Sequence, residues 1–103
     1  MTISMGIKHE DSGAYEVVPI ATSQYFEQRW LPACAHLGLR YVPHFHDGSL
    51  SALSAGDLGE VVKELEMLRA WATTNDPFMT ERIDGVLRAL HGSASIPCVY
   101  DFG

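Results

Sequence analysis

Basic residues are few in this chain. Its 103 residues include 7 Lys and Arg against 13 Asp and Glu, which gives a formal net charge of -6 at pH 7. A charge of this sign repels phosphate backbones and anionic membrane surfaces and favours a basic partner. The composition therefore argues against nucleic-acid binding, although a moderate net charge also simply keeps a small protein soluble.

Long apolar runs, a leader segment and paired cysteines are also missing. No window approaches the roughly 18 apolar residues that span a bilayer, and residues 1–9 have neither the basic nor the apolar region of a secretory signal. We therefore expect a cytoplasmic protein that is not bound to a membrane. Cys34 and Cys98 are far apart in the sequence and form no C-x-x-C pair, so we expect free, buried thiols and no cofactor.

Motifs for nucleophilic catalysis are a further absence. The chain has no G-x-S-x-G nucleophile elbow, and the segment around Ser49 fits turn and cap chemistry. A thiol and base could be imagined from Cys34 with His36 or His91, but both cysteines occupy positions expected in the core. We therefore expect a protein that is not an enzyme, while a small enzyme of unknown class remains an alternative.

The residues that are present predict one α+β domain over residues 1–103. Hydrophobic residues make up 47% of the chain, enough for one core. Alternating residues predict strands at 2–8 and 15–20, the second ending at Pro19. Thr22 or Ser23 can cap a first helix that ends at Gly38 and is broken near Leu31 by the following proline.

The second half begins with a predicted hairpin. Residues 39–46 alternate as a strand, Asp47 and Gly48 suit a type I′ turn, and residues 49–53 can return as its partner. A capping box at residues 54–57 opens the surest helix, and Asp76 with the next proline opens another that ends at Gly92. With a last strand at 96–102, we expect a small antiparallel or mixed sheet with about three helices on one face.

Two histidines suggest a metal site. Alternate residues of a strand project from the same face, so His44 and His46 could chelate a metal beside Asp47. No third firm ligand is evident in the sequence, and the competing interpretation is a solvated hairpin face. A small-molecule or metal-binding protein centred on this strand is therefore an alternative function.

The helix that follows the predicted hairpin has an acidic outer face. Asp57, Glu60 and Glu64 could dock a basic protein, and Trp71 flanks the apolar stripe as a candidate contact for a protein partner. The competing interpretations are a solvated helix face for the acids and core packing for the tryptophan. A homodimer by strand pairing is also open, at the strand that contains Pro43 or at the last strand.

One family resembles part of this pattern. An aromatic-rich first helix ending at Gly38 and Leu39, a hairpin, and a helix containing the sequence KELEML at 63–68 resemble small bacterial immunity proteins of polymorphic toxin systems, over residues 25–71. The resemblance implies a cytoplasmic, non-enzymatic α+β protein that neutralises a toxin by covering its active site. It assigns no functional residue in this chain. The leading hypothesis is therefore a protein-binding module.

Overall fold

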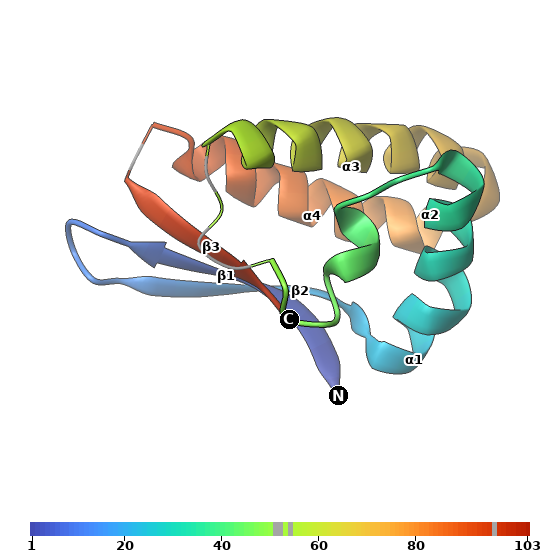
Figure 1. Ribbon diagram of the computed structural model, residues 1–103, viewed down its shortest axis with the longest axis horizontal. Helices are drawn as coiled ribbons and strands as arrows, with labels where there is room; N and C mark the ends of the chain where they lie inside the picture. The colour runs from blue at the N-terminus through green and yellow to red at the C-terminus, as the bar shows by residue number, and fades with distance from the viewer. Residues whose placement is uncertain (51–52, 54, 96) are drawn as a thin grey trace.

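A three-stranded antiparallel sheet with helices on one face forms the described part of the protein, in a computed structural model that describes residues 1–50, 53, 55–95 and 97–103 (Figure 1). The strands are β1 (Thr2–His9), β2 (Tyr15–Thr22) and β3 (Cys98–Phe102). Their order is β2-β1-β3, so β1 is central and the other two are edges. The predicted α+β class is confirmed.

Strand β1 shows the predicted alternation. Ile3, Met5 and Ile7 are buried under the helices, because every second side chain of a strand lies on the same face. Strand β2 does not end at Pro19 as predicted but continues to Thr22. The proline is tolerated because β2 is an edge strand and its register with β1 shifts between Ile3 and Ser4, where Pro19 lies opposite Ser4.

The first helical run has three parts: α1 (Ser23–Tyr25), the π-helical turn η1 (Phe26–Trp30) and α2 (Leu31–Leu37). Thr22 caps the run, its hydroxyl accepting the amide N–H of Tyr25 at 3.1 Å. The predicted break near Leu31 is confirmed as the end of the π turn, where the Leu31 N–H donates to the carbonyl of Phe26. At the other end Gly38 adopts the predicted left-handed conformation, with φ of 71°.

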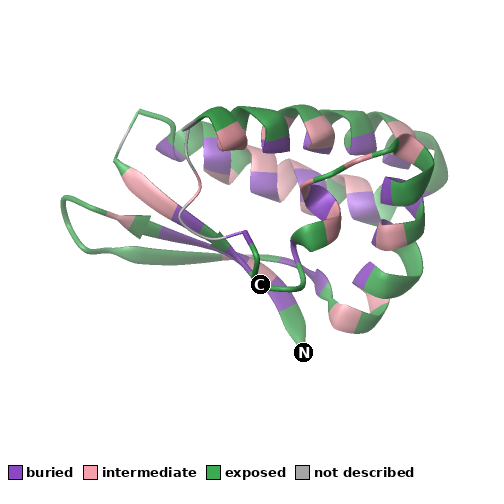
Figure 2. Ribbon diagram, viewed as in Figure 1, coloured by how far each residue is buried: buried purple, intermediate pink, exposed green. Residues whose placement is uncertain are grey.

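Helices α3 (Ala55–Asn75) and α4 (Pro77–Ser93) lie side by side over the sheet (Figure 1). Figure 2 shows buried residues on the sides of both helices that face the sheet. These buried residues include Val61, Leu65, Leu68, Ala72, Met79, Ile83, Val86 and Leu90. The first residue of the predicted capping box, at position 54, lies outside the described residues. Helix α4 ends at Ser93, one residue beyond the predicted end at Gly92. In the described part of the chain, none of the helices combines the length and apolar character that crossing a membrane requires.

Asp76 joins the first helical run to α4. Its carboxylate accepts the amide N–H of Met79 as an N-cap, the Tyr25 hydroxyl at 2.5 Å and the Arg29 Nε–H at 3.2 Å. Burial alone would raise the pKa of Asp76, but these three hydrogen bonds outweigh it and hold the pKa below its usual value. Burial together with Asp76 raises the pKa of Tyr25 to about 12.

The predicted hairpin is wrong. Residues 39–46 contain the short 3₁₀ helix η2 (Val42–His44). Its first residue, Val42, and the residue after it, Phe45, are both buried, at a spacing of three rather than two. Gly48 has the expected positive φ, 74°, but the chain then runs beside β3, where the Phe102 N–H donates to the Leu50 carbonyl at 3.0 Å. The predicted return strand includes residues 51 and 52, which lie outside the described residues.

The two cysteines differ in burial. Cys34 is buried as predicted, and burial together with the negative charge of Glu64 raises the pKa of its thiol to about 12. Cys98 is only half-buried, contrary to the expectation of a core thiol, because it is the first residue of an edge strand. Both are free thiols.

Candidate functional site

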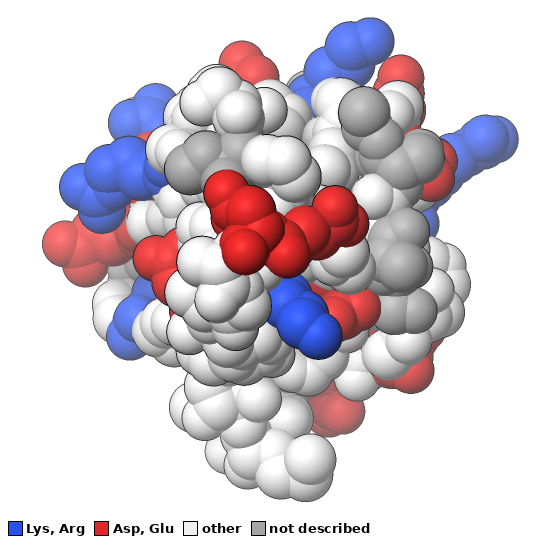
Figure 3. Space-filling model, turned by 90° about the vertical axis from the view of Figure 1, so that its left-hand side faces the viewer, with Lys and Arg blue, Asp and Glu red and all other residues white. Residues whose placement is uncertain are grey.

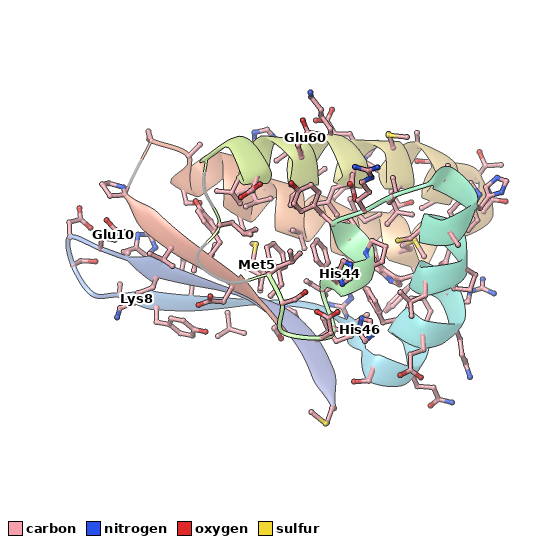
Figure 4. All side chains as sticks on the ribbon, viewed as in Figure 1. Met5, Lys8, Glu10, His44, His46 and Glu60 are labelled. Carbon is pink, nitrogen blue, oxygen red and sulfur yellow. The ribbon has the colours of Figure 1, made fainter. Side chains whose placement is uncertain are left out.

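The predicted acidic surface is the side of α3 against which the segment between α2 and α3 packs. Asp57, Glu60, Glu64 and Trp71 recur at helical spacing and so lie along one stripe of α3. The chain between α2 and α3 packs against this stripe through Tyr41 and its neighbours. Of these four residues only Glu60 is exposed, while the other three are half-buried, and Figure 4 shows Glu60 on the side of α3 away from the sheet.

Glu64 holds the segment before η2 in place. Its carboxylate accepts the backbone N–H groups of Arg40 at 3.0 Å, Tyr41 at 2.9 Å and Val42 at 3.1 Å. Three consecutive amides that converge on one carboxylate cannot pair with a neighbouring strand. This contact explains why the predicted strand does not form, and it gives Glu64 a structural role.

The other three members of the stripe also have neighbours. The Tyr41 hydroxyl donates to Asp57 at 3.0 Å, and this hydrogen bond with the negative charge of Asp57 raises the pKa of Tyr41. Glu60 lies 3.5 Å from Lys63, an exposed ion pair of small energetic value. Trp71 is half-buried and lines a hollow of about 320 Å³ with residues of α2, including Pro32 and His36. The partner-binding role of these residues stays a prediction.

His44 and His46 do not lie on a strand, so the geometry on which the predicted metal pair depended is absent. His44 lies in η2, where its Nδ1 is 2.8 Å from an Asp47 carboxylate oxygen, and the ring of His46 lies 5.3 Å from that of Phe26 (Figure 4). Hydrogen bonds from Ser49 and His44 hold the pKa of Asp47 well below its usual range. Among the described residues, no three His, Cys, Asp or Glu side chains gather as a metal centre would require.

In the described part of the chain, no helix lies on the sheet face opposite α3 and α4 (Figure 1). Tyr15 and Val17 on β2 are 61% and 59% exposed there, and Pro19 is exposed beside them. The Tyr15 ring lies across Gly6 of β1, where any larger residue would overlap its hydroxyl group. Exposed aromatic and branched side chains on neighbouring positions form an apolar surface of the kind that marks protein contacts.

The apolar surface continues around the β2 edge. A groove of about 360 Å³ lies there, lined by Pro19, Tyr25, Phe78 and Arg82 among others. Phe78 is 49% exposed, and its ring contacts that of Tyr25 edge-on, with 5.3 Å between the ring centroids. The central carbon of the Arg82 guanidinium lies 5.2 Å from the centroid of the Phe78 ring. The groove and the uncovered sheet face together form what we call the β2 surface.

The hairpin that joins β1 to β2 is acidic. Glu10 and Asp11 at its turn are exposed, and Glu16 follows at the start of β2. Figure 3 shows acidic side chains gathered at the centre of this end of the molecule, with basic side chains toward the edges and below. These acids gather negative charge at the end of β2 that carries Tyr15.

Sequence reasoning did not find the β2 surface. Residues 15–20 carry apolar side chains on both faces of the strand, so alternation could not show which face the helices cover. One signal in the sequence could have predicted this surface. Tyr15, Val17 and Pro19 stand at every second position and therefore share one face of the strand. Comparisons with protein-family models, with curated proteins and with solved structures find no match.

Proposed function

We propose that this protein is a binding module that docks a basic protein on its β2 surface. The observation that supports this most strongly is the sheet face away from the helices, where Tyr15 and Val17 remain more than half exposed although the apolar side chains of β1 on the other face are buried. Aromatic side chains on a rigid scaffold bury a large area at a small cost in conformational entropy. A three-stranded sheet in this position offers such a scaffold.

Charge supports the same class of partner. The net charge is -6, and the exposed acids of the hairpin stand next to the apolar surface. Complementary charge raises the rate of association more than it raises affinity, and its effect weakens as salt screens it. The expected partner therefore has a basic surface around an apolar contact.

The immunity-like resemblance of residues 25–71 narrows this proposal. Under it, the partner is a basic toxin in the cytoplasm of the same cell, and binding covers the toxin's active site. Of the residues that form the β2 surface, only Tyr25 lies within the resembling segment, so the proposal rests on the geometry of the sheet.

Affinity capture from a lysate of the source cell tests the proposal. The tagged protein is incubated at low and at physiological salt, and retained proteins are identified by mass spectrometry. We expect one basic protein, retained less at the higher salt and lost on substitution of Tyr15 and Val17. If retention of that protein is altered neither by the higher salt concentration nor by the substitutions, a docking site on the β2 surface is contradicted.

A further inference from the structure

Three side chains from three strands form a relay at the hairpin end of the sheet. Cys98 of β3 and His9 of β1 are direct partners in the antiparallel register. The Cys98 Sγ lies 3.6 Å from His9 Nδ1, and His9 Nε2 lies 2.9 Å from a carboxylate oxygen of Glu16 on β2. The imidazole thus stands between a thiol and a carboxylate, one nitrogen toward each.

This arrangement sets the roles of the two ring nitrogens. An ionised carboxylate only accepts hydrogen bonds, so Nε2 of His9 carries a proton and donates to Glu16. In the neutral ring Nδ1 is then an acceptor directed at the Cys98 thiol, which suits it to take the thiol proton. The thiolate is the reactive form of cysteine, and a base oriented by a third group is the usual way to generate it.

The thiol also borders a cavity. Cys98 lines a space of about 390 Å³ between the start of α3, the end of α4 and the start of β3. Its walls are mostly apolar, with Leu58, Val62 and Leu90 among them, and the volume falls in the range of small-molecule sites. An apolar chain a few carbons long can lie there while its reactive end meets the sulfur.

We propose that Cys98 is an acyl-acceptor site for thioesters or activated esters of apolar carboxylic acids. The Cys98 sulfur attacks the carbonyl carbon and forms a new thioester, the bond from carbon to the leaving thiol or alcohol breaks, and the proton taken by His9 passes to that leaving group. Glu16 is a positioning residue that holds the His9 ring. The reaction stops at one acyl group per chain.

The test uses the full-length protein with p-nitrophenyl hexanoate and p-nitrophenyl acetate at neutral pH. We expect a burst of one equivalent of p-nitrophenol, a matching mass increase located on Cys98, and faster reaction with the hexanoate because its chain enters the cavity. Cys98→Ser abolishes the burst. Cys34→Ser, which removes the other thiol, leaves it unchanged.

Variants of the relay separate chemistry from folding. His9→Gln slows the burst by about 100-fold, as loss of a general base does, and free imidazole partly restores the rate of His9→Gly. Glu16 is 59% exposed, so Glu16→Gln leaves the urea midpoint unchanged while it slows the burst, and Glu16→Asp restores part of the rate.

Two results would overturn the proposal: equal rates for the acetate and the hexanoate, or an acylation rate that His9→Gln does not change. Capture of the basic partner by Cys98→Ser is expected to match that of the unaltered protein. Failure of the acyl-acceptor site is therefore distinguishable from failure of the binding function.

Discussion

The Tyr15 ring lies across Gly6 on the uncovered face of the sheet, so a residue with a side chain at position 6 would displace it. This pair fixes the position of the largest exposed side chain on the β2 surface. Glycine is needed at this point of β1 because of close approach rather than because of a turn.

Replacing Gly6 with alanine tests this relationship. The methyl group forces the flexible end of Tyr15 away, so we expect a change of no more than about 1 kcal/mol in the free energy of unfolding, together with loss of nuclear Overhauser contacts between the Tyr15 ring and the backbone at position 6. Gly85→Ala is the control for the Tyr15 contacts, which it should leave unchanged, since a side-chain carbon at Gly85 meets nothing within 4 Å. Retention of those contacts in Gly6→Ala would contradict the packing described.

Glu64 and Glu60 lie one turn apart on α3, but we expect their replacement to change the free energy of unfolding by different amounts. Glu64→Ala leaves three backbone amides without their acceptor, so we expect a loss of about 2 kcal/mol in the free energy of unfolding, measured by urea titration. Glu60→Ala removes only an exposed ion pair and should change it by less than about 0.5 kcal/mol. Equal effects of the two substitutions would show that Glu64 does not hold the segment.

The same carboxylate explains which part of the fold the sequence could not predict. The features that were predicted all depend on residues a few positions apart. They are the alternation of strand β1, the caps at Thr22 and Asp76, the break near Leu31 and the apolar face of α3. Residues 39–46 alternate like a strand, yet their conformation depends on Glu64, 22 to 24 residues away, and Phe45 stacks on Phe102 at 4.2 Å between ring centroids. Contacts between residues so far apart in the sequence cannot be predicted from the pattern of neighbouring residues.

The candidate site shows the same limit. Asp57, Glu60 and Glu64 were predicted on an outer helix face, but Asp57 and Glu64 are half-buried and contact Tyr41. This contact follows from the path of the preceding segment, which the sequence did not show. The relay of His9, Glu16 and Cys98 joins residues up to 89 positions apart. Only the pairing of β1 with both edge strands brings them together.

The pH dependence of stability is predicted to include a contribution from Asp76. Its folded-state pKa lies below the value of about 3.9 usual in unfolded chains, so its stabilising effect is complete above that value and is lost as the pH falls through the folded-state pKa. Asp76→Asn should lower the free energy of unfolding by about 1–2 kcal/mol at neutral pH. Urea titrations across the acid range should show the two proteins converging, and a constant difference would contradict the assignment.

Cys34 is predicted to be inert in the folded protein. Its thiol is buried and its pKa is raised to about 12 by burial and by the charge of Glu64, so almost no thiolate forms near neutral pH. In the Cys98→Ser variant, a disulfide reagent such as Ellman's should react only as fast as the protein opens, and faster with added urea. Rapid reaction without denaturant would show that Cys34 is accessible.

The most direct test of the binding function compares two surfaces of the same protein against the partner obtained by affinity capture. Tyr15→Ser combined with Val17→Ser alters the β2 surface, while Met67→Ser alters an equally apolar side chain, 50% exposed on α3. Titration calorimetry should show affinity reduced at least tenfold, about 1.4 kcal/mol, by the double substitution and unchanged by Met67→Ser. Equal affinity of all three proteins for the partner would contradict docking through the uncovered sheet face.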